Sequence, residues 1–153
     1  MLVRMVVLMG LALVMANLAG CKTADKREVE SGGDAAFMRA AAEGNIAEVE
    51  MGRVAMQRAA STEVKLFAQR MIDDHSAANI RLRQLANTKN IALPDDPNLS
   101  HRMMLDRLQG KDGADFDRAY MAHMVEDHQK DIGAYEKEVR DGDDPDVVAY
   151  AGS

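Results

Sequence analysis

The chain is poor in residues that interrupt helices or cross-link a fold. Its 153 residues include three prolines, three tyrosines, three phenylalanines, no tryptophan and one cysteine. A single cysteine excludes a disulfide bond within the chain. The sequence has no glycine-rich dinucleotide-binding motif and no phosphate-binding loop. Its formal net charge of −6 argues against non-specific nucleic-acid binding, which requires a basic surface, so we expect no nucleic-acid partner.

The N-terminus has the features of an export signal. Arg4 precedes an apolar run, Met5–Met15, that is too short to span a bilayer comfortably and has the length of a signal-peptide core. The run leads to Leu18-Ala19-Gly20-Cys21, which resembles a bacterial lipobox. That resemblance implies a signal peptide over residues 1–20, cleavage before Cys21 and lipidation of Cys21. The alternative is a plain N-terminal anchor helix with an incidental cysteine.

A lipidated Cys21 would make the membrane the first expected partner, because several acyl chains together give stable anchoring. Residues 21–33 are mostly polar and end in Gly-Gly, which predicts a flexible tether between the lipid and the domain. Lys22 follows the cysteine, where an Asp would resemble the inner-membrane retention signal of Gram-negative lipoproteins. The resemblance therefore implies an outer-membrane anchor that faces the periplasm, with the inner membrane as the alternative.

Residues 34–153 are predicted to form an all-α domain. Ala, Met, Leu, Arg, Asp and Glu dominate the composition, which favours helices, and apolar residues recur at helical spacing. Asp34 is the expected N-cap of the first helix, and Gly44-Asn45 marks a place where that helix could kink. The expected helices run from Asp34 to about Ala60, from Ser61 or Thr62 to about Lys89, over residues 99–110, from Asp112 or Asp115 to about Arg140, and from Asp144-Pro145 to Ala151. Their apolar stripes favour a helical bundle.

Two segments of the domain repeat one cassette. FAQRMIDDHSAAN (67–79) and YMAHMVEDHQKDI (120–132) both place a Met four residues before a His and an acid-Asp pair directly before that His. A spacing of four residues puts Met71 one helical turn from His75, and Met124 one turn from His128.

The helical geometry of the cassettes brings the two histidines together. At about 100° per residue, each His lies at the centre of an apolar stripe and near the middle of its helix, so we expect both imidazoles at one level in the core. Asp74 and Asp127 are expected at the edges of the stripes. Glu48 occupies a comparable edge on the first helix, beside small residues that allow close helix approach, namely Gly52, Ala55 and Ala59.

The two cassettes, together with FMRAAAEGNIAEVEMGRVA and the Leu-Pro pair at 93–94, resemble the bacterial domain-of-unknown-function 4142 family. The resemblance covers about residues 35–150. It implies a ferritin-like antiparallel helical bundle in an exported or lipid-anchored protein whose function is not established. Members of the family continue through a further C-terminal helix, so the last helix is expected to be truncated here.

Three interpretations of the His pair remain open. The two rings could form a buried polar layer, paired with acids, that fixes helix register. They could also bind a divalent metal with carboxylates, although the Glu-x-x-His motif of ferritin-like sites is missing, because Ile72 and Val125 stand three residues before the histidines. The methionines instead favour Cu(I). The candidate metal ligands are His75, His128, Glu48, Asp74, Asp127, Met71 and Met124.

No catalytic residues are predicted, because Cys21 is expected to carry lipid and adjacent side chains on a helix diverge. The leading functional hypothesis is therefore a non-enzymatic envelope module with a core His pair, and the alternative is a metal-binding or metal-handling protein. A second copy of the chain or another envelope protein is the expected protein partner.

The lipobox can be tested by labelling in a Gram-negative host. Cys21→Ser is expected to abolish incorporation of labelled palmitate, because the acyl-bearing thioether cannot form without the thiol. Ser31→Ala, a nearby change outside the lipobox, should leave labelling unchanged. If the unmodified chain takes up no label, residues 1–20 act as a plain anchor helix instead.

Overall fold

The structure is a computed structural model that describes residues 24–153, with side chains from residue 33 onward. The predicted signal peptide and Cys21 lie outside the described residues. Within the described part the chain is all-α, as predicted, and contains no extended strand. Its helices are α1 (Ala24–Arg58), α2 (Thr62–Lys89), α3 (Leu99–Gln109), α4 (Gly113–Asp141) and α5 (Pro145–Ala151).

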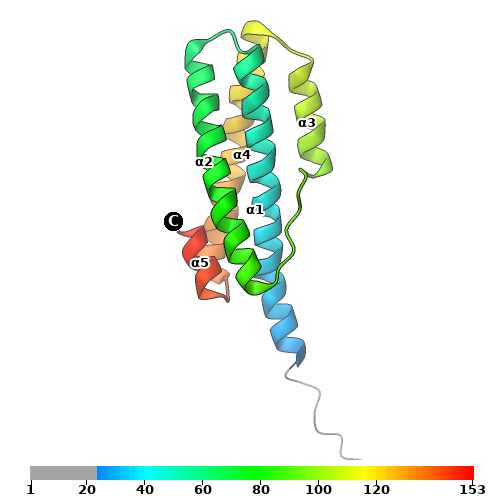
Figure 1. The fold of residues 1–153 in the computed structure, drawn as a ribbon, viewed down its shortest axis with the longest axis vertical. Helices are drawn as coiled ribbons and strands as arrows, with labels where there is room; N and C mark the ends of the chain where they lie inside the picture. The colour runs from blue at the N-terminus through cyan, green and yellow to red at the C-terminus, as the bar shows by residue number, and fades with distance from the viewer. Residues whose placement is uncertain (1–23) are drawn as a thin grey trace, which may run out of the picture.

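The three long helices α1, α2 and α4 form a bundle in which α2 and α4 run antiparallel to α1 (Figure 1). The helices α1, α2 and α4 lie side by side, and the segment after α2 runs back along α1, so that α3 points in the same direction as α1 (Figure 1). The helix α1 contacts α2, α3 and α4, and α5 packs on α4 and α2 at the other end from α3. This is the predicted ferritin-like arrangement, with a last helix of only seven residues.

Most helix ends follow the predicted caps. The Ser61 hydroxyl accepts hydrogen bonds from the backbone N–H groups of Glu63 and Val64, which are otherwise unsatisfied at the start of α2. Asn90 ends α2 in the left-handed conformation. The Asp144 carboxylate caps α5, whose first residue is Pro145.

The start of α1 was predicted wrongly. The helix begins at Ala24, continues through Gly44-Asn45 without a break, and includes residues 24–33, which were predicted as part of a flexible tether. Extending an existing helix costs much less than nucleating one, and residues 24–30 include the strong helix formers Ala, Lys, Arg and Glu. The buried carboxylate of Asp34 accepts hydrogen bonds from the backbone N–H groups of Asp143 (3.2 Å) and Asp144 (2.7 Å). It therefore ties α1 to the start of α5 and is not an N-cap of α1.

Small residues on α1 let α2 approach closely, as predicted. A Cβ atom on Gly52 would lie 2.8 Å from the Ile72 Cγ1 and 3.0 Å from the Ala68 carbonyl oxygen. Such distances are too short for a side chain, so glycine is required for this helix contact. Helical spacing predicts that Met56 belongs to the apolar stripe of α1, but its side chain is exposed, whereas Met51, five residues earlier, is fully buried.

The core has two apolar clusters, one toward each end of the bundle. The upper cluster, beside the turn between α1 and α2, contains Ala47, Met51, Ala55, Ala59, Ala68, Leu108, Phe116, Tyr120 and Met124. The lower cluster contains Met38, Ala41, Ala42, Leu82, Ala86 and Val147. On α1, Asn45 falls between the two clusters and is buried, which makes room for a polar layer across the middle of the bundle.

The buried face of α4 is rotated from the predicted one. Val125, Ile132 and Val139 are exposed, although the sequence places them on the apolar stripe, whereas Asp127 is buried and was expected at the stripe edge. The reason is that α4 packs on α1 and α3 on one side, whereas on the other it meets the short α5 and a few side chains of α2. The stripe is therefore shifted toward Asp127, and His128 lies at the margin of the core.

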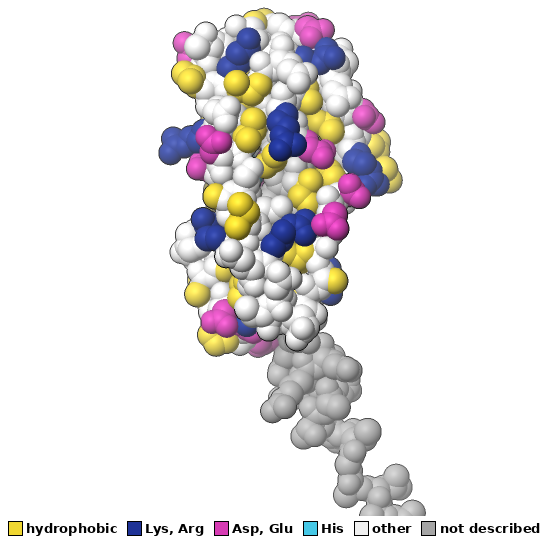
Figure 2. Space-filling model, in the orientation of Figure 1, with side chains coloured by type: hydrophobic (Ala, Val, Ile, Leu, Met, Phe, Trp, Pro, Cys, Tyr) yellow, Lys and Arg dark blue, Asp and Glu magenta, His cyan; other side chains and the backbone are white. Residues whose placement is uncertain are grey.

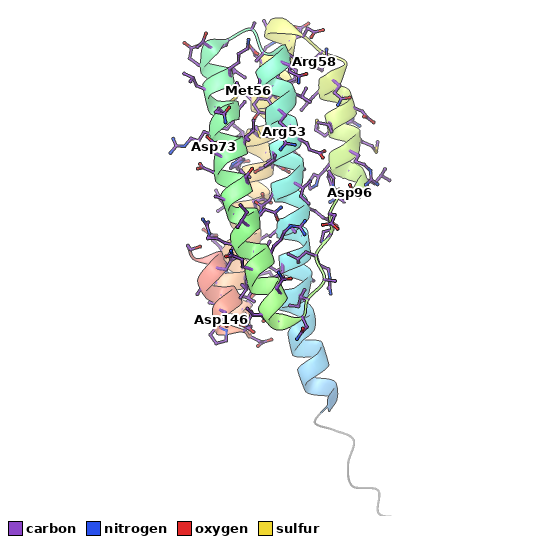
Figure 3. All side chains as sticks on the ribbon, in the orientation of Figure 1. Arg53, Met56, Arg58, Asp73, Asp96 and Asp146 are labelled. Carbon is purple, nitrogen blue, oxygen red and sulfur yellow. The ribbon has the colours of Figure 1, made fainter. Side chains whose placement is uncertain are left out.

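The surface carries mixed charge. On the face in Figure 2, Lys and Arg side chains lie among Asp and Glu side chains, with separate apolar side chains between them, as on ordinary solvated surfaces. Ion pairs tie both ends of the bundle. Arg58 contacts Asp112 at 2.9 Å near the start of α4, and Asp146 on α5 contacts Lys89 at 3.0 Å (Figure 3).

Among the described residues, no helix combines the length and apolar character needed to cross a membrane.

Replacing Asp34 with alanine should destabilise the domain by about 2–3 kcal/mol, because two hydrogen bonds to a charged acceptor are lost and two backbone N–H groups lose their partner. Urea unfolding followed by circular dichroism measures this change. Asp106→Ala, on the exposed face of α3, should change the free energy of unfolding by less than about 0.5 kcal/mol. Equal effects of the two substitutions would show that Asp34 does not hold α1 to α5.

Candidate functional site

A fully buried carboxylate marks the middle of the bundle. Glu48, on α1, has 0% of its side chain exposed. Neither of its oxygens accepts a hydrogen bond of normal geometry. Instead Oε2 lies against the Nε2 atom of His75 on α2, and Oε1 lies 3.5 Å from the Nδ1 atom of His128 on α4. A buried charge needs compensation, and the two imidazoles supply it.

His75 is oriented by two residues of α1. Its Nδ1 atom lies 2.9 Å from the Asn45 side-chain oxygen, and its Nε2 atom faces Glu48. Burial by itself would lower the pKa of His75, but the Glu48 carboxylate, with smaller contributions from Asp131 and Asp74, raises it above the ordinary value. Both ring nitrogens face oxygen acceptors, so the metal-free ring is expected to carry two protons.

His128 meets His75 from the other side of Glu48. The two ring centroids are 5.7 Å apart and the rings are perpendicular, which confirms the prediction that both histidines lie at one level. The Nδ1–H group of His128 donates to the Met124 backbone carbonyl at 2.8 Å, so its Nε2 atom is left with a free lone pair. Its side chain is 37% exposed, compared with 20% for His75.

Further carboxylates surround Glu48. Ligand atoms of Glu48, His75 and His128 lie within 4.8 Å of one another, and so do those of Glu48, Asp127 and Asp131. Asp131 is half-buried on α4. Burial, reinforced by the carboxylates of Glu48 and Asp127, raises its pKa to about 6, against the opposing effect of the two histidines. Glu48 therefore belongs to both groups, and the site has more negative than positive formal charge.

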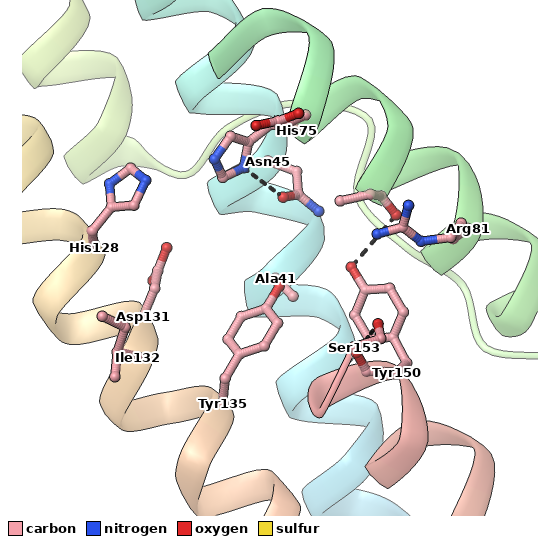
Figure 4. A pocket seen from close by; sticks show the side chains of 12 residues that line it. Ala41, Asn45, His75, Arg81, His128, Asp131, Ile132, Tyr135, Tyr150 and Ser153 are labelled. Carbon is pink, nitrogen blue, oxygen red and sulfur yellow. Dashed lines mark hydrogen bonds between the residues drawn. The ribbon is translucent and has the colours of Figure 1, made fainter. Parts of the chain in front are cut away.

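A cavity of about 350 Å³ opens beside the two histidines (Figure 4). Asn45, His75, His128 and Asp131 line one end of it, and side chains from α5 line the other. At the α5 end, the Tyr150 hydroxyl donates to the Ala78 backbone carbonyl at 3.4 Å. The helix α5 packs on α4 and α2 at the lower end of the bundle (Figure 1), and its Tyr150 lines the cavity there. The cavity leaves the histidines accessible to a small solute.

The structure brings together only some of the candidate ligands. Glu48, His75, His128 and Asp127 converge. Asp74 lines the cavity, but its carboxylate is largely exposed and pairs with Arg70 at 3.5 Å, which places it outside the two ligand groups. Its candidacy fails because it points about a third of a turn away from His75.

The methionine four residues before each cassette histidine is buried in the bundle. Met124 packs in the upper apolar cluster, and it is its backbone carbonyl, not its sulfur, that contacts His128. Met71 is also buried. The assembled donors are thus imidazole and carboxylate groups, which favours a divalent metal over the Cu(I) alternative.

Asn45 and Asp131 were missed by the sequence interpretation. Asp131 stands three residues after His128, one turn along the same face, and this spacing could have indicated it. Asn45 was interpreted only as a helix-weakening residue beside Gly44. Its position three residues before Glu48 on the same helix places it on the same side of α1, which is the signal that could have found it.

The family model described as Domain of unknown function (DUF4142) matches residues 19–153 of the chain. No curated protein matches the sequence. Among solved structures, a protein of Streptomyces coelicolor described as a secreted DUF305 protein matches with a TM-score of 0.68 and 17% sequence identity, covering 78% of this chain and 80% of that one. At this identity the likeness concerns the fold alone, and it confirms the helical bundle.

The metal-free protein should lose stability as the pH rises from 5 to 8. Asp131, Glu138 and His75 all have raised folded-state pKa values, so each contribution is present below the unfolded-state pKa and is lost as the pH passes the folded-state pKa. That interval runs from 3.8 to about 6 for Asp131 and from 4.5 to about 7 for Glu138. After solvent screening, the Asp131 contribution is on the order of 1 kcal/mol. The lowered pKa of His123 acts in the opposite direction, but it is one group against three.

Urea unfolding at pH 5 and pH 8 measures this dependence. Asp131→Asn and Glu138→Gln should each make the fall smaller, because each removes one titrating group. Asp73→Asn, at an exposed position, should leave it unchanged. A wild-type protein that is more stable at pH 8 than at pH 5 would contradict the raised pKa values assigned to these groups.

Proposed function

The chain belongs to the family described as Domain of unknown function (DUF4142), and from the buried cluster around Glu48 we propose that it binds a divalent transition-metal ion. The observation behind the proposal is the fully buried Glu48 carboxylate, whose two oxygens lack ordinary hydrogen bonds and face two imidazoles. In the metal-free protein only His75 makes a close contact with this carboxylate, so its burial is incompletely compensated and costly for the fold. A cation between these groups would remove that cost.

The donor set fits such an ion. Two imidazoles and one carboxylate are ligands that Zn(II) and similar metals accept, and their ligand atoms already lie within 4.8 Å of one another. Asp131 and Asp127 add negative charge beside them. The excess of carboxylates over imidazoles is therefore compensated better by a dication than by the single proton that His75 gains.

The orientation of the rings also suits metal binding. Each His directs Nδ1 to an oxygen acceptor, the Asn45 side chain or the Met124 backbone carbonyl. Metal-binding histidines commonly hold their second ring nitrogen in this way, which fixes the tautomer and keeps the other lone pair for the metal. In His75 that other nitrogen is the one against Glu48.

Metal and proton compete at this position. The proton that bridges His75 Nε2 and Glu48 in the metal-free protein must leave before a metal can bind there. Metal affinity should consequently weaken at acidic pH. The cavity beside His128 and Asp131 provides the route for the ion and for water.

The cellular setting is part of the proposal. We propose an exported protein, lipid-anchored through Cys21 and facing the periplasm from the outer membrane, that acts as a non-enzymatic metal-binding module. The support lies in the apolar segment and the lipobox-like residues that precede the bundle. A second copy of the chain or another envelope protein stays a predicted partner.

Counting bound ions tests the metal site. Glu48→Gln keeps the size of the side chain but removes its charge, so the variant is expected to bind one Zn(II) fewer per chain than the wild type after dialysis. In the wild type, free Zn(II) at 100 times its dissociation constant should raise the free energy of unfolding by about 2.7 kcal/mol for this site. His75→Gln should lose the same ion.

Asp74→Asn is the matched control, because it changes an acid one residue from His75 that lies outside the ligand groups. It should retain the full number of ions. If Glu48→Gln is folded and binds as many ions as the wild type, for Zn(II), Mn(II) and Fe(II) alike, the cluster is a structural polar layer that sets helix register.

A further inference from the structure

A second polar cavity lies on the other side of α4 from the two histidines of the cassettes. It has a volume of about 450 Å³ and is formed by the first turns of α3 and the middle of α4. Its walls include the two remaining histidines of the chain, His101 and His123, with Asp127 and the side chains of Met103 and Met104. None of the interactions of the central cluster uses His101 or His123.

The fold holds both histidines in place. The Asn98 side chain caps α3 by accepting the backbone N–H of His101 at 3.0 Å, and its amide group donates to Glu43 of α1 at 2.9 Å. His101 is thereby fixed in the first turn of α3. His123 stands one turn before Asp127 on α4, with 3.9 Å between its Nε2 atom and Asp127 Oδ2.

Both rings have a buried nitrogen with no hydrogen-bond partner. These atoms are Nδ1 of His101 and Nε2 of His123. The His123 side chain is nine-tenths buried, with 10% exposed, and lines the cavity. Burial and the neighbouring His101 lower the pKa of His123, against the effect of Asp127. Neutral imidazole is the form that binds metals.

We propose that this cavity is a second metal-binding site, in which the imidazoles of His101 and His123 bind a transition-metal ion and Asp127 supplies an anionic oxygen. Two unpartnered imidazole nitrogens are costly when buried, and a metal ion bound between the two rings would remove that cost. Imidazole donors select zinc, copper and neighbouring metals, whereas Mg²⁺ and Ca²⁺ prefer oxygen ligands. Of the two cationic side chains that line the cavity, Lys130 is paired with Glu126 at 2.7 Å.

The central site and this second site draw on different histidines, so their ions can be counted separately. The purified protein is titrated with Zn(II), and in a parallel experiment with Cu(I), and bound metal is measured after dialysis. The double variant His101→Gln/His123→Gln is expected to lose one ion per chain relative to the wild type. The Glu48→Gln variant, which tests the central site, should keep the ion bound by His101 and His123.

The count is combined with a spectroscopic measurement on the wild type. Metal binding should shift the imidazole nitrogen resonances of His101 and His123 by tens of parts per million, and this shift should persist in Glu48→Gln. The second site is disproved if the double variant binds as much of both metals as the wild type, or if neither metal moves these resonances. If only the central site fails to bind metal, the double variant should still bind one ion fewer than the wild type.

Discussion

Burial of the Glu48 carboxylate is the constraint on which the middle of the bundle depends. An uncompensated carboxylate in that position would cost several kcal/mol, so residues on both neighbouring helices must face it. His75 on α2 and His128 on α4 do so. Their helices can therefore slide along α1 only by leaving the charge unpaired. The polar layer sets the register of three helices that apolar packing alone would specify less strictly.

The position of this layer explains the two-part core. Apolar clusters lie toward each end of the bundle and supply most of the burial, while the layer between them supplies specificity. Replacing buried ionic groups with apolar residues is often neutral or stabilising. Stability alone therefore does not require the five titratable groups of this layer, namely Glu48, His75, Asp127, His128 and Asp131, and the proposed cation would give them a role.

The short α5 connects the fold with access to the site. This helix packs on α4 and α2, and the cavity that it lines with Tyr150 reaches His75 and His128. The rotation of α4 has the complementary effect on the other side. It buries Asp127 and turns His123 toward α3, so one helix presents histidines to two separate cavities. How this one helix is turned therefore decides which of its histidines faces each cavity.

The sequence by itself determined the all-α fold, most helix ends and the level of the two cassette histidines, because helical periodicity and capping chemistry act over a few residues. Ser61, Gly110 and Asp144 show this, since each marks a helix end in the structure as predicted. Tertiary structure alone decided that Glu48 is fully buried, that Asp127 is buried more deeply than His128, and that Asn45 and Asp131 join the site. The physical reason is that periodicity identifies the apolar side of one helix, whereas the depth of a residue depends on how many helices surround it. The helix α1 is packed against α2, α3 and α4, whereas one side of α4 is covered only in part, by the short helix α5. Neither fact can be inferred from the sequence of a single helix.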